Sequence, residues 1–383
     1  MTPTPTAPAR HRRWRFLLAL PLLLAISACN VGGKRFPLDT LNPKGPEART
    51  IDHLVNPVFL IAGVVFVLVQ GGILMLAWRF RSRKDDDGTL PPQIHGNTKL
   101  ELGWTIIPAL LLAGVGGASV LTILDLDDHP ADAMEVTVIG QQWWWEYRYD
   151  VDQDGKDDIV TANDLVIPAG KPVDLTITSR DVIHSFWIPA LNGKRDAVPG
   201  RTAPLLIEAD KPGVYRGQCT EFCGLSHGYM RMRVVALGEA DYAAWQANQM
   251  TEAKAPTDPL ALEGREVFRT TCSQCHHVRG AEGNDEQFHG SATISGSAPD
   301  LTHLASRGVF AGSVFDLWVD TDKNGEVDIP ELGGTFNVAD LEKWLRDPPG
   351  QKPMYPQGQR GMPNLNLSQV QIDQLVAYLQ TLE

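Results

Sequence analysis

Cysteine is scarce in this chain, and the cysteines present are not spaced like a disulfide framework. Only 5 of the 383 residues are cysteine. Four of them form two close pairs, Cys219 with Cys223 and Cys272 with Cys275, a spacing typical of cofactor binding. The fifth, Cys29, ends an N-terminal apolar segment. We therefore expect no cysteine to remain for a structural disulfide.

Positive charge is also in short supply. The 34 lysines and arginines are outnumbered by 46 aspartates and glutamates, which gives a formal net charge of −12. This balance argues against nucleic-acid binding, which depends on cationic surfaces. An acidic face would steer a basic protein partner towards the chain, although ordinary solubilising charge explains the same composition.

The first 28 residues have the features of a signal peptide. Four arginines between residues 10 and 15 precede an apolar run at residues 16–26 that is too short to cross a bilayer. The Ser-Ala-Cys that follows resembles a bacterial lipoprotein cleavage site, which predicts removal of residues 1–28 and lipidation of Cys29. An ordinary signal peptide with a chance cysteine is the alternative.

Two uncharged runs predict a transmembrane hairpin. Residues 55–78 and 104–124 carry no charge over 24 and 21 positions, long enough for a helix to cross a hydrocarbon core of roughly 30 Å. The basic cluster after the first run predicts a cytoplasmic loop, and export of the N-terminus gives the same topology. We therefore assign residues 29–130 to an N-terminal segment and hairpin in a bacterial cell membrane, with everything after Asp125 outside the cytoplasm.

The rest of the chain divides into a β-rich part and a helical part. Residues 131–238 contain short alternating apolar runs between glycines and prolines, which predicts an all-β sandwich or Greek-key barrel. Residues 239–257 form a helix-prone linker. Residues 258–383 are predicted to be helical, and Ser368 with Gln371 forms a capping box before apolar residues at helical spacing.

Four potential metal ligands lie within twelve positions: Cys219, Cys223, His227 and Met230. Thiolate, imidazole and thioether donors together select copper over hard cations, and a methionine argues against zinc. A mononuclear blue-copper site needs one cysteine, whereas two cysteines four residues apart can bridge a pair of copper ions. The second histidine that such a pair needs is available at His184, 35 residues before Cys219.

These residues carry a resemblance to a known family. His184 followed by Cys-x-Glu-x-Cys-x3-His-x2-Met at residues 219–230 resembles the CuA site of cytochrome c oxidase subunit II, and the resemblance covers residues 50–240. It implies a cupredoxin-like domain in which the backbone carbonyl of Glu221 binds copper. The carboxylate of Glu221 would bind a magnesium ion at the boundary with subunit I, and residues 194–201 resemble the family segment near that boundary.

Two further segments resemble family features. Residues 142–147, QWWWEY, resemble the aromatic patch whose first tryptophan, here Trp143, receives the electron from the donor. A tryptophan-rich strand packed against the hairpin is the alternative. Because successive side chains of a strand face opposite sides, we expect at least one of the three tryptophans to face the surface. Residues 100–108 resemble the start of the second span, where Glu101 would stand at the mouth of a proton path, although a favourable helix-dipole position explains the same glutamate.

A haem attachment signature lies in the helical part. The sequence Cys-Ser-Gln-Cys-His at residues 272–276 predicts thioether bonds from Cys272 and Cys275 and an axial iron bond from His276. A thioredoxin-like pair is the alternative, which the adjacent histidine disfavours. Met362, in a loop that resembles the methionine loop of small cytochromes c, is the predicted second axial ligand, with Met354 as its competitor. One branch of bacterial oxidases has a cytochrome c domain fused after the CuA domain, and this chain resembles that branch.

Two acidic loops depart from that pattern. Residues 320–331 match the spacing of an EF-hand loop, which predicts calcium ligands at Asp320, Asp322, Asn324, Glu326, Asp328 and Glu331. Residues 150–155 begin in the same way but lack the closing glutamate. A solvated acidic turn is the alternative for both loops.

Together these features predict the subunit through which electrons enter a bacterial haem-copper terminal oxidase. Electrons would pass from haem c to the dinuclear copper and on to subunit I, where oxygen is reduced. The chain would thus be an enzyme only as a subunit of cytochrome c oxidase. Its expected partners are subunit I, other oxidase subunits, membrane lipid, and cytochrome c or another redox protein as donor.

Two other classes of protein share parts of this pattern. A nitrous-oxide-reductase-like protein has the same copper motif but needs a further histidine-rich copper cluster, and ten histidines are too few once the ligands are assigned. A copper-delivery protein needs no electron carrier, so a covalent haem argues against it.

Overall fold

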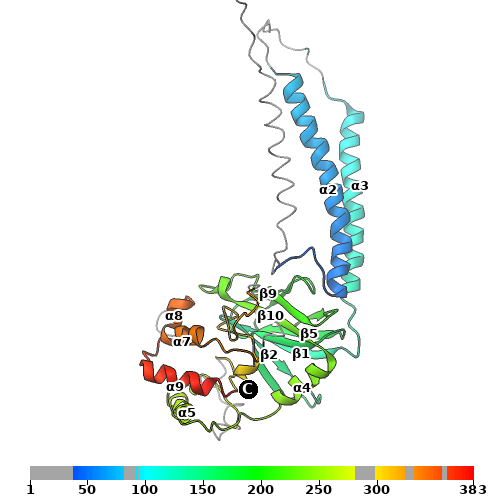
Figure 1. The fold of residues 1–383 in the computed structure, drawn as a ribbon. Coiled ribbons are helices and arrows are strands. Elements are labelled where there is room, and N and C mark those ends of the chain that lie inside the picture. The colour runs from blue at the N-terminus through cyan, green and yellow to red at the C-terminus, as the bar shows by residue number, and fades with distance from the viewer. Residues whose placement is uncertain (1–37, 82–91, 93–94, 281–297, 324–331, 356–359) are drawn as a thin grey trace, which may run out of the picture. The chain divides into compact units, whose positions relative to one another are not determined.

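The computed structural model describes residues 38–81, 92, 95–280, 298–323, 332–355 and 360–383 (Figure 1). Within these ranges the chain forms two long helices, a β-rich domain and a set of C-terminal helices. The predicted signal peptide at residues 1–28 and the predicted lipid-bearing Cys29 lie outside the described residues.

Helices α2 (Pro46–Arg79) and α3 (Thr98–Leu126) contain the two predicted spans. Proline stands in the first turn of α2, where its missing N–H is not needed. Asn97 caps α3 by accepting hydrogen bonds from the N–H groups of Lys99 and Leu100, at 3.2 and 3.3 Å. In the most apolar 18-residue stretch of each helix, no side chain is buried against the rest of the protein. A helix can face lipid in this way because its backbone N–H and C=O groups are hydrogen-bonded within the helix. The predicted hairpin is confirmed.

The start of α2 is hydrogen-bonded to the β-rich domain. The N–H of Lys44 donates to the carbonyl of Ala190 at 2.7 Å, and the N–H of Ala48 donates to the carbonyl of Leu191 at 3.1 Å. These bonds tie the start of the helix to a loop of the domain.

Two facing sheets and a short ladder make up the β-rich domain. The larger sheet has the order β3-β2-β1-β5-β8, the smaller one has the order β4-β10-β9, and β6 pairs with β7. Strands β1 and β5 are parallel, as are β4 and β10, and the other pairs are antiparallel. The strand bounds are β1 Met134–Gln141, β2 Trp144–Tyr149, β3 Ile159–Ala162, β4 Asp164–Pro168, β5 Val173–Ser179, β6 His184–Phe186, β7 Arg195–Ala197, β8 Ala203–Ile207, β9 Gly213–Gln218 and β10 Arg231–Leu237. Several strands that pair are not consecutive in sequence, so the chain crosses from one sheet to the other, as in a Greek-key domain. The predicted cupredoxin-like domain is confirmed.

Apolar side chains at alternate positions of the strands fill the space between the two sheets. In β5 the residues Val173, Leu175 and Ile177 are fully buried, and the residues between them are less buried. The ring of Trp145 meets the ring of Phe186 edge to face at 5.3 Å, which sets strand β6 against strand β2. This contact matters for the site because β6 begins at a predicted copper ligand.

The C-terminal helices form a second core. The elements are α4 Glu239–Gln249, α5 Pro259–Thr271, η2 Leu304–Ser306, β11 Val309–Phe310, β12 Phe315–Asp316, α7 Val338–Arg346, α8 Pro348–Gln351 and α9 Gln369–Leu379. The predicted capping box of Ser368 and Gln371 is confirmed at the start of α9. The ladder of β11 and β12 adds a short sheet to the predicted helices. Helices α5 and α9 lie side by side (Figure 1), so close at Gly264 that a Cβ there would stand 1.9 Å from the carbonyl oxygen of Gln374.

A hydrogen bond to a buried ion pair of the β-rich domain joins the two cores. Arg233 of β10 donates to both carboxylate oxygens of Asp164, at 2.8 and 2.9 Å, and both residues are buried. The N–H of Gly308, which precedes β11, donates to the same carboxylate at 2.7 Å. Removing one partner of such a pair would leave an uncompensated buried charge. The contact therefore fixes the C-terminal helices on the β-rich domain.

Candidate copper and haem sites

The predicted copper ligands come from three places in the β-rich domain and meet in one cluster. His184 begins β6, Cys219 follows β9, and Cys223 lies on the loop that leads to β10. The loop closes because the N–H of Cys219 donates to the carbonyl of Met230 at 2.9 Å. The N–H of Thr220 donates to the carbonyl of Ser185 at 3.0 Å, which brings the loop beside β6.

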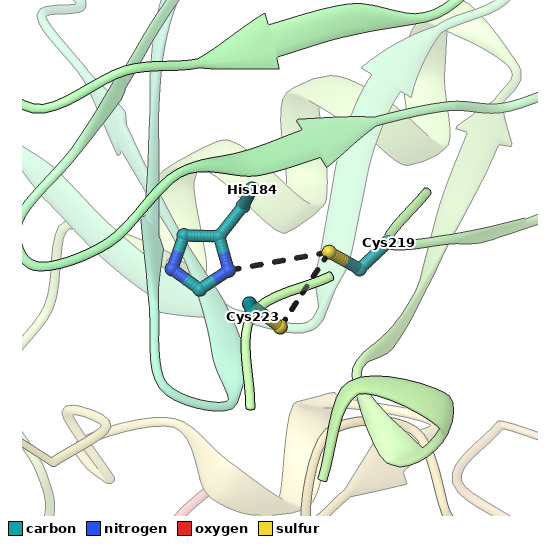
Figure 2. A group of neighbouring side chains, drawn as sticks. All are labelled: His184, Cys219 and Cys223. Atoms are coloured by element: carbon teal, nitrogen blue, oxygen red, sulfur yellow. Dashed lines mark hydrogen bonds between the residues drawn. The ribbon is translucent and has the colours of Figure 1, made fainter. Parts of the chain in front are cut away.

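The donor atoms are arranged around two sulfurs, as Figure 2 shows for three of the residues. The Sγ atoms of Cys219 and Cys223 are 3.8 Å apart, and Nδ1 of His184 lies 4.0 Å from Sγ of Cys219. Near Sγ of Cys223 are Nδ1 of His227 at 3.5 Å and Sδ of Met230 at 3.8 Å. Each sulfur thus has its own imidazole, and one has a thioether in addition. This set fits a pair of soft metal ions bridged by two thiolates.

The carbonyl oxygen of Glu221 completes the set. It lies 3.3 Å from Sγ of Cys219, so the predicted backbone ligand is also at the cluster. The Glu221 side chain is exposed, which leaves its carboxylate accessible to a neighbouring subunit.

The two thiols of the cluster have pKa values shifted in opposite directions. The hydrogen bond from Cys223 lowers the pKa of Cys219 to about 4, and burial of the Cys219 thiol opposes this shift only in part. The same bond, together with burial, raises the pKa of Cys223 well above its usual value. Metal ions bind thiolates, so copper binding at this site would be accompanied by proton release.

Asp181 supports the cluster from behind His184. Its carboxylate lies 2.8 Å from Nε2 of His184 and accepts a hydrogen bond from the N–H of Gln142, also at 2.8 Å. Burial alone would lower the pKa of His184, but hydrogen bonds to Asp181 and Cys219 raise it overall. A carboxylate on the outer nitrogen of a ligating histidine fixes the ring and its tautomer.

A cavity of about 640 Å³ lies between the helical core and the β-rich domain. Helix α5 ends at Thr271, and the following turn presents Cys272, Cys275 and His276 to this cavity. Nδ1 of His276 lies 2.8 Å from the carbonyl oxygen of Pro299, which leaves Nε2 as the free nitrogen. Burial lowers the pKa of His276, so the ring is held neutral, the form that binds iron. Two thiols, a neutral imidazole and a largely apolar wall fit a covalent haem.

Both candidate methionines line the cavity, but they pack differently. Met362 packs against the core of the C-terminal helices, whereas Met354 packs against the core of the β-rich domain. Met362 thus packs against the same core as Cys272 of the attachment motif, which favours it over Met354 as the second iron ligand.

The expectation of a surface-facing tryptophan is wrong. Trp143, Trp144 and Trp145 are 2%, 6% and 0% exposed. The physical reason is a distant segment of the same chain: the ring of Tyr355 lies 5.4 Å from that of Trp143, and Nζ of Lys352 donates to the Trp143 carbonyl at 2.5 Å. On its other side, Nε1 of Trp143 donates to the carbonyl of Cys223 at 3.0 Å.

The remaining predicted residues are apart from this cluster or outside the described ranges. Glu101 is exposed in the first turn of α3. Asp320 and Asp322 precede the undescribed residues 324–331, so four of the six predicted calcium positions lie outside the described residues: Asn324, Glu326, Asp328 and Glu331.

Sequence reasoning missed Asp181 and Lys352. Asp181 stands three residues before His184, a spacing that offered a signal. Lys352 carried no signal, because a lysine in a loop is ordinarily exposed. Here it is buried, and burial lowers its pKa to about 7, although the neighbouring Cys223 opposes the shift.

The fold and donor set define a membrane-anchored cupredoxin-like copper protein. Residues 41–121 match the family described as cytochrome c oxidase subunit II, transmembrane domain, and residues 151–237 match its periplasmic domain. The chain is 34% identical over 382 residues to cytochrome c oxidase subunit 2 of Alkalihalophilus pseudofirmus, covering 96% of this chain and 97% of that one. It is 32% identical over 388 residues to the same subunit of Bacillus sp. (strain PS3), covering 97% and 98%. The chain belongs to the cytochrome c oxidase subunit II family.

A solved structure is also similar. The periplasmic domain of subunit II of the cytochrome oxidase of Bradyrhizobium japonicum is 30% identical, covering 31% of this chain and 95% of that one, with a TM-score of 0.29. Membership of the family makes the chain a subunit of a terminal oxidase in the inner membrane, with its copper domain in the periplasm.

Proposed function

We propose that this subunit passes single electrons from a haem c in its C-terminal domain to a dinuclear copper centre and on to the oxygen-reducing subunit I. The proposal assigns residues 131–238 to the copper domain and residues 258–383 to the haem domain. Both cofactors, when bound, supply one-electron redox chemistry. The roles below belong to the side chains that hold and connect them.

The copper roles follow from the donor geometry. Cys219 and Cys223 would bridge the two ions, and His184 and His227 would each bind one of them. Met230 and the Glu221 carbonyl would complete the coordination. The exposed Glu221 carboxylate would face subunit I and a magnesium ion there, and Glu101 would stand at the mouth of a proton path.

The haem roles follow from the cavity. Cys272 and Cys275 would form the thioether bonds, and His276 and Met362 would be the axial ligands. The apolar wall would limit the access of water to a bound haem, which is one of the factors that set a haem's reduction potential.

The position of Trp143 carries the proposal. This side chain lines the cavity and also donates to the carbonyl of Cys223, a residue of the copper cluster, at 3.0 Å. One buried residue therefore contacts both candidate cofactor sites. An electron can cross between them within the protein interior, without passing through solvent.

The first experiment counts the cofactors. The purified subunit should contain two copper ions per chain in a mixed-valent centre, seen by metal analysis and electron paramagnetic resonance. It should keep one haem after denaturation, seen by mass spectrometry. Cys219→Ser should abolish the mixed-valent signal and keep the haem, whereas Cys272→Ala with Cys275→Ala should lose the covalent haem and keep the copper. One copper per chain, or a haem that dissociates on denaturation of the unaltered chain, would contradict the proposal.

Three assignments that lie wholly or partly outside the described residues accompany it. Residues 1–28 would be removed as a signal peptide, and Cys29 would carry the lipid, which mass spectrometry of the N-terminal peptide tests directly. The acidic loop at residues 320–331 would bind calcium, and calorimetry with millimolar calcium against a chelator tests that assignment.

A further inference from the structure

The copper-ligand loop, residues 219–230, is held in part by the C-terminal domain. At the end of the loop, the N–H of Arg231 donates to the carbonyl of Gly312 at 3.0 Å. Within the loop, the hydroxyl of the buried Ser226 donates to the carbonyl of Pro353. The C-terminal domain therefore contacts the loop at two points, one inside the ligand segment and one directly after it.

The hydroxyl of Ser226 bonds to the other domain and not to its own helix. Ser226 precedes the short helix η1 (His227–Tyr229), a position at which a serine side chain commonly accepts a hydrogen bond from a backbone N–H of the helix. No such cap bond is present at η1, and the bond that the hydroxyl makes goes to Pro353. The copper ligand His227, which is the next residue, is thus tied to the C-terminal domain through its neighbour.

The turn between β11 and β12 meets the copper domain with no spare room. Gly312, in this turn, has a φ of +75°. A Cβ at this position would stand 2.8 Å from the carbonyl oxygen of Tyr229, in the copper-ligand loop, and 2.8 Å from that of Trp143. Only a glycine allows the turn to approach the copper domain this closely.

Lys352 joins the two contacting segments. Its buried Nζ donates to the carbonyl of Ala311, in the turn, at 2.9 Å and to the carbonyl of Trp143, in the copper domain, at 2.5 Å. An ammonium that is removed from water relies on such partners, so the three segments are held together at this point. We call residues 311–313 and 352–353 the clamp.

We propose that the clamp positions the copper-ligand loop, so that copper binding and docking of the C-terminal domain strengthen each other. The proposal rests on the copper part of the proposed function and does not depend on the haem. The clamp contacts are made with a loop whose two sulfurs already lie 3.8 Å apart. Because copper and the clamp order the same loop, each reduces the cost of ordering that the other has to meet.

Linkage makes this effect reciprocal. The factor by which docking raises copper affinity equals the factor by which copper favours docking. A chain without copper would therefore hold its C-terminal domain less firmly than a loaded one.

The first test measures how fast the full-length subunit loses copper to an excess of chelator, followed by electron paramagnetic resonance of the centre. Gly312→Ala should raise this rate about tenfold, because the added atom would push the turn away from the loop. Gly333→Ala is the matched control. Gly333 lies in the same domain with a φ of +78°, so alanine brings similar backbone strain, but its Cβ would meet no described atom within 4 Å.

Ser226→Ala tests the second contact without adding volume. Loss of its one hydrogen bond to Pro353 should raise the rate of copper loss about twofold to tenfold. Thr178→Val removes a bond from a hydroxyl to the carbonyl of Arg201 that lies within the copper domain, and it should leave the rate unchanged. Circular dichroism verifies that each variant is folded.

Hydrogen–deuterium exchange tests the reciprocal effect. In the unaltered chain, copper loading should slow exchange in residues 309–316, which contain the turn, and Gly312→Ala should remove this effect. Equal rates of copper loss in Gly312→Ala and Gly333→Ala, or exchange at residues 309–316 that does not respond to copper, would overturn the coupling alone. An unaltered chain that binds no copper pair would overturn the copper assignment and the coupling with it, which metal analysis reports separately.

Discussion

Replacing Asp181 by asparagine should weaken copper binding although Asp181 is not a ligand. Three donors converge on its carboxylate: Nε2 of His184 at 2.8 Å, the N–H of Gln142 at 2.8 Å and the N–H of Val182 at 2.7 Å. An asparagine side chain has one oxygen that accepts hydrogen bonds and one NH₂ group that only donates them. At least one of the three donors would therefore face this NH₂ group and lose its hydrogen bond. The negative charge that stabilises the bound form of His184 would also be lost.

The magnitude follows from the kind of bond removed. A hydrogen bond to a charged group contributes about 1.5–3 kcal/mol, and each 1.4 kcal/mol corresponds to about a tenfold change in affinity. Loss of an outer partner of a ligating histidine typically costs about 10- to 100-fold in metal affinity, and the two ranges agree. We therefore expect Asp181→Asn to lower copper affinity by about 10- to 100-fold.

The assay is competition for copper between the apoprotein and a chelator, with electron paramagnetic resonance of the loaded form. Asp210→Asn is the control, because it removes the same charge from a partly exposed ion pair with Arg49. If Asp181→Asn binds copper as tightly as the unaltered chain, with an unchanged spectrum, the supporting role of Asp181 is refuted.

Two further predictions concern the C-terminal domain, to which the haem is assigned. Gly264→Ala should lower the free energy of unfolding by about 1–3 kcal/mol, because the added Cβ would overlap the Gln374 carbonyl. Calorimetry measures this change. The control is Gly213→Ala, which should be nearly neutral because its added Cβ meets only ordinary van der Waals contacts. Met362→Leu should abolish the absorption band near ~700 nm that marks methionine ligation of ferric haem, and Met354→Leu should keep it. A band lost in the Met354 variant alone would reverse the ligand assignment.

The copper cluster could be predicted from the sequence because its chemistry is local. Four donors lie on one loop, and a loop closed by two adjacent strands has few ways to arrange them. His184 was predicted because a two-copper site requires a second imidazole. This histidine lies on a predicted strand, and a neighbouring strand can bring a residue that is distant in sequence next to the loop. The structure brings all of these donors together.

The burial of Trp143 could not be predicted in the same way. Strand periodicity describes which side of a sheet a residue faces, but not what covers that side. The cover comes from residues more than 200 positions later, and nothing in the local sequence around Trp143 refers to them. The burial of Lys352 could not be predicted for a related reason. It results from the contact between the two domains.

That contact also determines how the fused domain works. A cytochrome domain on a flexible linker would visit the copper domain only part of the time, at an effective concentration set by the linker. Here the linker is helix α4, whose Tyr242 packs against the β-rich domain together with Trp245. Undocking would also take the Gly308 N–H from the buried Asp164 carboxylate and would leave Nζ of Lys352 without the carbonyl of Trp143. Water would replace the lost partners, so each of these bonds favours the docked state by a net of about 0.5–1.5 kcal/mol. In the function proposed above, these contacts make the C-terminal domain a fixed part of the electron path and not a carrier that shuttles to and from the copper.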